Sequence, residues 1–466
     1  MPTPPHPVIT IVGGGFAGTA LAVQLARQPG LENADIRLVE PRAVPGPGLA
    51  YTARRPEYLL NVRPAALSLY PEQPAHFAEW LQAQPEAAHG LPDFAARATY
   101  GRYLNQELSA VLAAPTAAGR GIRWHNATAE AVEKQFVGGY QVRLSNGETW
   151  ASDFLVLALG NFAPPPPAGP DLAYLAHPGY HPDPWAVGSL RRIGPDESVL
   201  LIGSGLTAVD VLLALRHDGH RAPVAVVARH GRWPAAHGPA SASYPNFYAG
   251  LATETTVAGV LHVFNQHRRA AAARGLDWRP VLDCLRPDLG RIWANWSLAE
   301  QCRFLRHLSS LWAVTRHRSP PENAAAITNL TASGWVQLHV GRVREIVADG
   351  EVLRVRVKDA AEAVNAWHTA QHVVSCTGPL LDYSRIDTPL VRGLRAAGML
   401  VPDPLGLGML TDAHGALLGA DGQPSSALFT LGASRRPAYF ESTAVPELRQ
   451  QAAALAQELA RRATEI

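Results

Sequence analysis

Short apolar runs alternate with stretches rich in alanine and leucine along this chain. Val8 to Val12 is apolar, an Ala/Leu-rich stretch covers Thr19 to Arg27, and a second apolar run covers Ile36 to Val39. Continuous apolar runs are typical of buried parallel strands, and the stretch between them has the composition of a helix. The pattern therefore predicts a strand-helix-strand unit at the amino terminus.

The same order returns near the middle of the chain. Apolar runs cover Ser198 to Ile202 and Val224 to Ala228, and a helix-favouring stretch from Thr207 to Leu215 lies between them. In both places a glycine-rich turn joins the first strand to the helix, with the sequences Gly13-Gly14-Gly15-Phe16-Ala17-Gly18 and Gly203-Ser204-Gly205-Leu206-Thr207-Ala208. In such turns the glycines allow a tight turn, close approach of a pyrophosphate and close helix packing. Two dinucleotide-binding units are expected.

The two units differ after their second strand. Glu40 lies 22 residues after Gly18, where a carboxylate can accept hydrogen bonds from ribose hydroxyls. In the second unit Arg229 lies 21 residues after Ala208, and Arg232 follows it closely. A guanidinium attracts the 2′-phosphate of NADP, whereas a carboxylate repels it. We interpret the first unit as FAD-binding and the second as NADPH-binding, with NADH less favoured. The alternative for both arginines is an ordinary exposed loop position.

The chain also repeats at the scale of domains. Each unit is followed by hairpin-like segments and then by a similar closing strand, Asp153 to Gly160 and His372 to Gly378. The proline-rich segment Asn161 to Pro167 indicates a linker. The expected fold class is α/β, with two tandem Rossmann-like domains for FAD and NAD(P)H and a helical insert. The expected boundaries are 1–189 for the first part of the FAD domain, 190–378 for the NAD(P)H domain with the insert at 241–321, and 379–466 for the C-terminal part of the FAD domain.

The final helix is expected at about Ala444 to Ala463. Ser442 and Thr443 precede it as a start signal, and Pro446 lies in its first turn. Its amino-terminal dipole would stabilise a reduced flavin if it pointed at the ring, although an ordinary capping role explains these residue types equally well.

The insert is rich in tryptophan, arginine and histidine. An amphipathic helical cap with packed tryptophans and solvated arginines explains this composition. The other interpretation is that arginines such as Arg306 and Arg318 clamp a substrate carboxylate.

Composition narrows the classes of protein. The net charge of +2 with 17% charged residues provides no basic field for nucleic acid. No apolar run approaches 18 residues and the amino terminus lacks a signal-peptide pattern, so a soluble cytoplasmic protein is expected. Cys284, Cys302 and Cys376 are widely spaced, which argues against a disulfide framework, a metal site and the cysteine pair of a disulfide reductase.

Several segments resemble a largely uncharacterised family of FAD/NAD(P)-binding proteins over essentially the whole chain. They are Gly46-Pro47-Gly48-Leu49-Ala50-Tyr51, Leu59-Leu60-Asn61-Val62, His76-Phe77 with Trp80, Tyr100-Gly101-Arg102-Tyr103-Leu104, Gly205 to Asp210, Arg316-His317-Arg318 and Glu441 to Leu448. One branch resembles the flavin-dependent amino-acid N-monooxygenases that oxidise aspartate to nitrosuccinate. The two-domain plan is more distantly similar to ornithine and lysine N-hydroxylases, flavin monooxygenases and Baeyer–Villiger monooxygenases.

The last two groups carry a Phe-x-Gly-x-x-x-His-x-x-x-aromatic fingerprint between their domains. Here His181 and Trp185 match its second half, whereas Leu175 and His177 replace the Phe and Gly. A Baeyer–Villiger assignment is therefore not favoured, and we interpret His181 as a linker histidine.

The resemblance implies an NADPH-consuming flavin monooxygenase that acts through a flavin C4a-(hydro)peroxide. Its partners would be molecular oxygen and an amine or amino acid, with an aspartate-like substrate as one option, and a homo-oligomer stays open. A flavin reductase that passes electrons to a quinone or protein, and an FAD-binding redox sensor with little turnover, are the alternatives.

The site residues expected from the motifs and the resemblance fall into four groups. For FAD they are Gly13, Gly15, Phe16, Ala17, Gly18, Glu40, Asn61, Gly160, Gly378, Gly432, Ser442 and Thr443; for NADP they are Gly203, Gly205, Leu206, Thr207, Arg229 and Arg232; for substrate they are Arg306 and Arg318; and the candidates for a catalytic acid or base are His76 and Glu441. No metal ligand is expected.

Overall fold

The computed structural model describes residues 6–465, apart from 53–54, 86–89, 91, 115–120, 137, 168, 170, 187, 240–242 and 360–364. The chain divides into two compact units. Unit 1 consists of Met1–Arg54, Val62–Asn161 and Leu381–Ile466, and unit 2 of Arg55–Asn61 and Phe162–Leu380.

A six-stranded sheet forms the centre of unit 1, in the order β15-β16-β7-β1-β2-β3. The strands are β1 (Val8–Val12), β2 (Asp35–Val39), β3 (Gly121–His125), β7 (Phe154–Leu157), β15 (Ala416–Leu418) and β16 (Pro424–Thr430). All neighbours pair in parallel except β15 and β16. The side chains of β7 are buried throughout, as continuous apolar runs predict.

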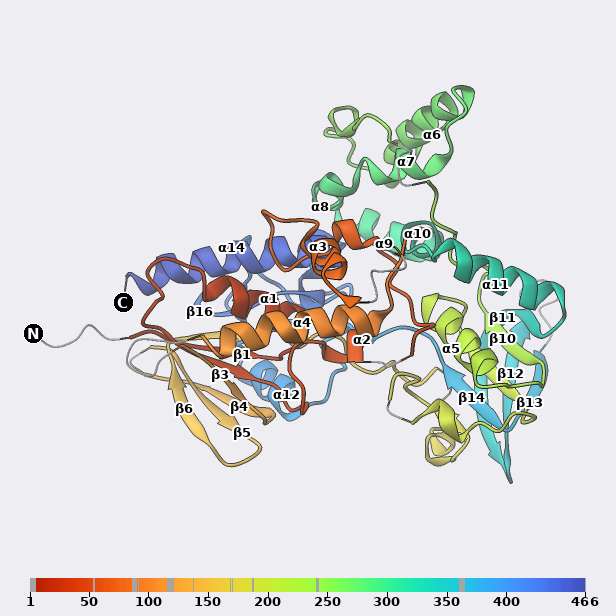
Figure 1. Ribbon diagram of the computed structural model, residues 1–466, viewed down its shortest axis with the longest axis horizontal. Coiled ribbons are helices and arrows are strands. Elements are labelled where there is room, and N and C mark those ends of the chain that lie inside the picture. The colour runs from red at the N-terminus through yellow and green to blue at the C-terminus, as the bar shows by residue number, and fades with distance from the viewer. Residues whose placement is uncertain are drawn as a thin grey trace, which may run out of the picture. The chain divides into compact units, whose positions relative to one another are not determined.

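Helices and a small sheet complete unit 1 (Figure 1). The helices are α1 (Phe16–Leu25), α2 (Gly48–Thr52), α3 (His76–Gln82), α4 (Arg97–Leu112), α12 (Pro389–Ala396), α13 (Arg436–Tyr439) and α14 (Val445–Ala463). The small antiparallel sheet contains β4 (Ala129–Lys134), β5 (Tyr140–Leu144) and β6 (Thr149–Ser152). Helix α14 packs along α1, so the end of the chain returns to the first glycine-rich unit.

Unit 2 repeats this plan around a seven-stranded sheet, in the order β13-β12-β11-β10-β9-β14-β8. Its strands are β8 (Tyr180–His181), β9 (Val199–Ile202), β10 (Val224–Ala228), β11 (Val336–Asp349), β12 (Val352–Asp359), β13 (Asn365–Ala370) and β14 (His372–Ser375). Helices α5 (Leu206–His217) and α11 (Pro321–Ala332) pack against each other, and α11 also contacts β11. The α/β fold class with two dinucleotide-type units is confirmed.

The insert of unit 2 is helical in its described part. It contains α6 (Val257–Ala273), α7 (Trp278–Asp283), α8 (Leu289–Ala294), α9 (Leu298–His307) and α10 (Ser309–Arg316). Trp293, Trp296 and Phe304 are buried against one another, with the two indole rings 6.0 Å apart. The tryptophans therefore form a local core, and Figure 1 shows α6 and α7 standing away from the sheet of the same unit. The expected start of the insert at 241 lies outside the described residues.

Residues 162–189 fold with unit 2, whereas the sequence pattern assigned them to the first domain. Tyr180 pairs with Val373 because β8 joins the edge of the second sheet, and Tyr174 is buried in the core of that sheet. A two-residue strand with an irregular approach has no recognisable periodicity, so its partner sheet could not be predicted from sequence.

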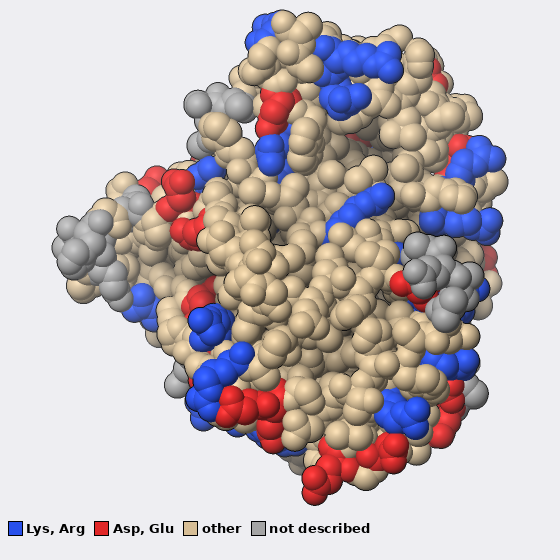
Figure 2. Space-filling model, turned by 90° about the vertical axis from the view of Figure 1, so that its right-hand side faces the viewer, with Lys and Arg blue, Asp and Glu red and all other residues tan. Residues whose placement is uncertain are grey.

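Charged side chains are dispersed on the face drawn in Figure 2. Lys and Arg alternate there with Asp, Glu and uncharged residues, without a continuous basic surface. Among the described helices, none is long and apolar enough to cross a lipid bilayer. The described residues also contain no cluster of metal-ligating side chains.

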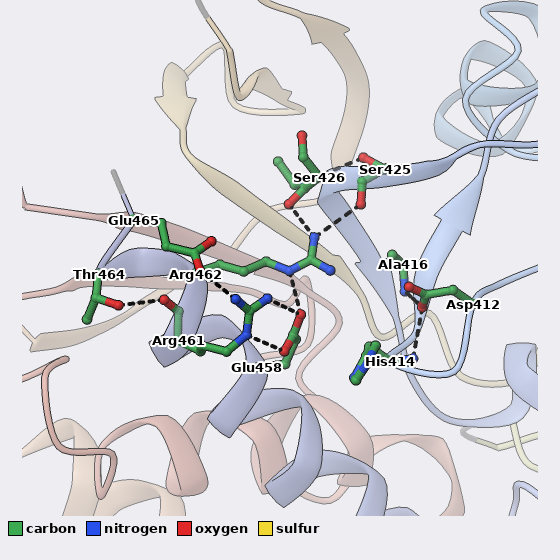
Figure 3. A network of polar contacts seen from close by, with 11 residues as sticks. Asp412, His414, Ala416, Ser425, Ser426, Glu458, Arg461, Arg462, Thr464 and Glu465 are labelled. Atoms are coloured by element: carbon green, nitrogen blue, oxygen red, sulfur yellow. Dashed lines mark hydrogen bonds and ion pairs between the residues drawn. The ribbon is translucent and has the colours of Figure 1, made fainter.

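The carboxyl end of α14 is fixed to β16 by an ion-pair network (Figure 3). Glu458 accepts hydrogen bonds from Arg461 Nε at 3.0 Å and from Arg462 Nε at 2.7 Å. Arg462 also donates to the carbonyl oxygens of Ser425 and Ser426, at 3.3 and 2.7 Å. The pKa of Glu458 is lowered from 4.5 to about 2, mainly by the hydrogen bonds from Arg461 and to a smaller extent by those from Arg462.

We predict that Glu458→Gln lowers the melting temperature at neutral pH. A carboxyl with a lowered folded-state pKa stabilises the fold above its unfolded pKa of 4.5, and this stabilisation is lost as the pH falls towards about 2. The difference in melting temperature between wild type and variant should therefore shrink below pH 4.5. Calorimetry across this pH range checks it, and a constant difference at every pH would contradict the ionic explanation.

Candidate dinucleotide-binding sites

The first glycine-rich turn requires glycine for steric reasons. Gly13 has φ +108°, and a Cβ there would lie 2.2 Å from the carbonyl oxygen of Ala158. Its N–H donates to the carbonyl oxygen of Val39 at 2.8 Å. A Cβ on Gly18 would lie 1.8 Å from the carbonyl oxygen of Gly13. The turn therefore brings β1, β2, β7 and α1 closer together than any larger residue allows.

The start of α1 is open to an anion. Gly15 is the N-cap, so no side chain caps the helix, and its first turn contains no acidic residue. Phe16 and Gly18 of that turn are buried, whereas Ala17 is half-buried. The first N–H groups of a helix carry partial positive charge and bind phosphate when no side chain occupies them. The predicted FAD pyrophosphate site thus has the required backbone geometry.

Glu40 lies directly after β2 and is 2% exposed. Its Oε2 accepts from the N–H of Gly14 at 2.8 Å, and its Oε1 accepts from the N–H of Arg42 at 3.0 Å and from Arg42 Nη1 at 3.1 Å. A carboxylate has further acceptor positions beyond these contacts. Glu40 is therefore fixed beside the turn and keeps the capacity to accept a ribose hydroxyl.

The family-like segment Gly46 to Tyr51 packs against this turn. The N–H of Gly46 donates to the carbonyl oxygen of Gly14 at 2.8 Å, and a Cβ on Gly48 would lie 2.8 Å from the Cα of Gly15. Gly48 has φ +59°. Close backbone packing explains the glycines of this segment. The sequence separation between the segment and the turn did not indicate this contact.

The second turn has the same construction in unit 2. Gly203 has φ +110°, its N–H donates to Val227 at 2.8 Å, and a Cβ would lie 2.5 Å from the carbonyl oxygen of Cys376. Gly205 is the N-cap of α5, again without a side-chain cap and without an acidic residue in the first turn, where Leu206 and Thr207 lie. Ala208 is fully buried at the place of the third glycine. The start of α5 is therefore uncapped in the same way as the start of α1.

Positive side chains gather after the second strand of unit 2. Arg229, His230 and Arg232 follow β10 and are exposed. Burial, followed by the charges of Arg229 and Arg232, lowers the pKa of His230. The backbone of this loop is held to the turn because Ser204 Oγ donates to the carbonyl oxygen of Arg232 at 2.7 Å. No carboxylate of the described residues forms an ion pair with either arginine, so both remain available to a phosphate.

Three further predicted glycines adopt positive φ at strand ends. Gly160 follows β7 with φ +67°, Gly378 follows β14 with φ +87°, and Gly432 follows β16 with φ +94°. Gly432 is also fixed by side chains, because its N–H donates to Gln451 Oε1 at 3.2 Å and its carbonyl oxygen accepts from Ser442 Oγ at 2.5 Å.

Neither Ser442 nor Thr443 caps the last helix with its side chain. The N-cap of α14 is Ala444, and no side chain caps the helix. Ser442 is fully buried and instead links Gly432 to Gln451, whose Nε2 donates to it at 2.8 Å. Two tertiary hydrogen bonds thus replace the local cap, and the N–H groups of this helix start, next to Thr443, are left without a side-chain cap.

The two candidate catalytic residues have different surroundings. His76 begins α3, and its Nδ1 lies 2.9 Å from the hydroxyl of Tyr103. Glu441 is 9% exposed and follows Phe440, which has φ +57°. Glu441 also raises the pKa of Arg436, against a larger lowering by burial.

The remaining predicted residues lie in unit 2. The carbonyl oxygen of Asn61 hydrogen-bonds to His237 Nε2 at 2.9 Å. Arg318 is 4% exposed, and its guanidinium pairs with both oxygens of Asp283 at 2.7 and 2.8 Å. Arg306 is exposed on α9. The donors of Arg318 are thus used inside the insert, whereas those of Arg306 face solvent.

Sequence reasoning missed a chain of polar side chains in unit 2, of which His181 and His372 are buried. His181 Nε2 lies 3.0 Å from His372 Nδ1, and His372 Nε2 lies 2.8 Å from Glu197 Oε2. His181 Nδ1 also lies 3.2 Å from Ser189 Oγ. The two histidines are 191 residues apart, so only the parallel pairing of β8 with β14 brings them together.

Comparison with known proteins supports this description. A family model described as FAD-NAD(P)-binding matches residues 10–162, which include the first turn, Glu40 and β7. Residues 10–162 thus resemble a FAD-NAD(P)-binding region. A search of curated protein sequences found no match.

Solved structures share the fold over nearly the whole chain. An ornithine N-hydroxylase from Kutzneria sp. 744 has a TM-score of 0.66 at 16% identity, with 98% of this chain and 100% of that chain covered. The L-lysine 6-monooxygenase from Pseudomonas syringae has a TM-score of 0.66 at 17% identity and the same coverage. The thioredoxin reductase of T. acidophilum has a TM-score of 0.51 at 11% identity, with 97% of both chains covered. At these identities the likeness shows a shared fold, which the named hydroxylase, monooxygenase and reductase have in common.

We predict that the two glycines of the second turn respond differently to alanine. Gly203→Ala forces a Cβ against Cys376 at positive φ and should destabilise unit 2 by about 1 kcal/mol or more. Gly205 has φ −79° and no atom within 4 Å of a Cβ, so Gly205→Ala should keep the stability and weaken dinucleotide binding. Denaturant unfolding and NADPH titration of both variants separate the effects. Equal losses of stability would contradict the assignment of separate roles.

Proposed function

We propose that this protein is a FAD- and NADPH-dependent monooxygenase that N-hydroxylates an amino acid or a related small amine. The main support is that each glycine-rich turn leads into a helix whose start has no side-chain cap. The second strand of unit 1 is then followed by Glu40, and that of unit 2 by Arg229, His230 and Arg232. The solved ornithine and lysine monooxygenases with the same fold support the reaction class.

Unit 1 has the residues that FAD requires. The close-packed Gly13 and Gly18 shape the turn, the open start of α1 suits a pyrophosphate, and Glu40 is placed for a ribose hydroxyl. The proposed FAD set in this unit also includes residues at strand and helix ends, namely Gly160, Gly432, Ser442 and Thr443. Asn61 and Gly378 belong to unit 2 and stay predictions from the sequence. When bound, FAD supplies hydride acceptance and oxygen activation.

Unit 2 has the residues that select NADPH. The uncapped start of α5 binds the pyrophosphate through its N–H groups, and the guanidinium groups of Arg229 and Arg232 bind the 2′-phosphate. His230 adds a third cation when it is protonated. NADPH is therefore the proposed reductant, and NADH is the weaker ligand.

Hydroxylation of an amine requires the removal of a proton. An α-amino group has a pKa of about 7.7–8.0, so a substrate amine is largely protonated at neutral pH and cannot act as a nucleophile. Of the two candidates, we favour Glu441 as the residue that takes this proton, because it is buried after the strained Phe440.

The proposed substrate class is an amino acid with an anionic group. Arg306 is the proposed carboxylate contact, because its guanidinium is exposed whereas that of Arg318 is paired with Asp283. An aspartate-like substrate fits this arrangement. Arg306→Ala should then raise KM for an acidic amino acid. Arg303→Ala serves as the control, because Arg303 pairs with Glu300, and it should leave this KM unchanged.

We predict that Arg229→Asp reverses the cofactor preference. Loss of a charge-assisted hydrogen bond costs about 1.5–3 kcal/mol, which corresponds to about tenfold or more in affinity, and the new carboxylate adds repulsion. NADPH affinity should fall while NADH affinity stays nearly constant, as measured by titration of flavin-free and flavin-loaded protein. Arg274→Asp, on an exposed arginine of the same unit, should change neither. An unchanged NADPH-to-NADH ratio would remove Arg229 from the site.

The reaction class is tested by product analysis. We predict that FAD-loaded protein oxidises NADPH faster with one member of a panel of amino acids and small amines, and that mass spectrometry finds this member one oxygen heavier. NADPH oxidation accelerated by quinones without any oxygenated product would indicate a reductase. Stable FAD binding without accelerated NADPH oxidation by any compound would indicate a redox sensor.

A further inference from the structure

A series of aromatic rings runs through unit 1 from the first glycine-rich turn to the surface. Phe16 stacks on Tyr100 of α4, with ring centroids 6.3 Å apart. Tyr100 stacks on Tyr103, with centroids 5.5 Å apart and planes inclined by 28°. Tyr103 meets Trp80 of α3 edge-on at 5.7 Å. Both tyrosines are fully buried and Trp80 is half-buried, so three oxidisable rings connect the core to the surface.

Helix periodicity produces this alignment. Tyr100 and Tyr103 are three residues apart on α4, and His76 and Trp80 are four residues apart on α3, so each pair lies on one face of its helix. Phe77 fills the space between the helices, at 4.8 Å from Tyr100 and 5.3 Å from Tyr103. The rings are therefore held in place from both sides.

Tyr103 has a base within hydrogen-bonding distance. Its hydroxyl lies 2.9 Å from His76 Nδ1, and its oxygen accepts the N–H of Leu69 at 3.3 Å. In the tautomer of His76 that carries its proton on Nε2, Nδ1 accepts the phenol proton of Tyr103. A neutral imidazole can take a proton that a phenol releases.

Burial raises the pKa of Tyr103 and keeps this phenol protonated in the resting state. The charge of Glu107 raises this pKa further, while the Leu69 N–H and the charge of Arg449 lower it. The ring of Tyr70 faces His76 edge-on at 4.8 Å. Proton release from Tyr103 therefore requires removal of an electron.

We propose that Tyr103 and His76 form a redox-active pair, connected to the surface by Trp80. A one-electron oxidant takes an electron from the indole of Trp80. Tyr103 then returns an electron to the indole while its phenol proton moves to His76 Nδ1. The products are a reduced oxidant, a neutral Tyr103 radical and a His76 imidazolium, and electron donation by a surface reductant reverses the sequence.

This activity goes beyond the proposed monooxygenase and does not depend on it. In the direction written, the oxidising equivalent moves from the half-buried Trp80 to the fully buried Tyr103. It also gives His76 a role other than proton transfer with a substrate.

Two other tyrosines provide matched controls. Tyr70 donates to Glu107 Oε2 at 2.5 Å, but a carboxylate is a weaker base than imidazole, with pKa values of about 4.3 and 6.5. Tyr244 lies 3.0 Å from His267 Nδ1 in unit 2, and its ring contacts among the described residues are with Phe247 and His267, neither of which is an indole. Only Tyr103 combines a histidine base with a tryptophan neighbour among these three.

The test uses the full chain and an external oxidant, so that it needs no FAD. A ruthenium(III) polypyridyl complex is generated by a laser flash, and the tryptophan and tyrosine radicals are followed by transient absorption and by freeze-quench electron paramagnetic resonance. In the wild type a tyrosyl radical should rise as the tryptophan radical decays, more slowly in D2O. Trp80→Phe should remove the fast phase of this rise.

The variants decide the assignment. Tyr103→Phe should abolish the fast tyrosyl phase, and Tyr70→Phe and Tyr244→Phe should retain it. His76→Gln keeps a hydrogen-bonding side chain without a comparable base, so the fold is kept, as circular dichroism can check, and the phase should be lost. A fast phase that survives in Tyr103→Phe or in folded His76→Gln, or one that disappears in Tyr70→Phe, would overturn the proposal. Because the oxidant is external, absence of hydroxylation activity would leave this result unaffected.

Discussion

The close approach of backbone at the two glycine turns is the constraint on which both units depend. At Gly13 and Gly203 the turn after the first strand lies so close to the end of the closing strand that a Cβ is excluded. Each turn also leaves its helix start without a side-chain cap. The geometry that closes the sheet thus coincides with the proposed anion site, so the first glycine of each turn would affect both stability and ligand binding.

The chemical difference between the units arises from a few side chains on this common frame. Glu40 is buried and fixed by backbone N–H groups, whereas Arg229 and Arg232 are exposed on a loop held by Ser204. A buried carboxylate selects a neutral hydroxyl, and exposed guanidiniums select a phosphate. On the proposed assignment, the same fold distinguishes two dinucleotides by charge.

Local signals allowed the fold and both turns to be predicted from sequence, because apolar runs, glycine spacing and helix composition are all short-range. Contacts between distant segments could not be predicted in the same way. Ser442 resembles a helix cap but bonds to Gly432 and Gln451, and Arg318 resembles a substrate ligand but pairs with Asp283. In both cases a polar side chain found a tertiary partner that the local sequence does not indicate.

The histidine pair of unit 2 shows why a surviving motif fragment need not retain its chemistry. Burial, followed by the charges of His372 and Arg192, lowers the pKa of His181 to about 4. His181 is therefore neutral near neutral pH, and its two nitrogens are occupied by Ser189 and His372. A neutral imidazole with both nitrogens engaged inside the protein has no position left for a substrate proton. Its physical effect is to fasten β8 to β14, where a two-residue strand has too few backbone hydrogen bonds to remain paired by itself.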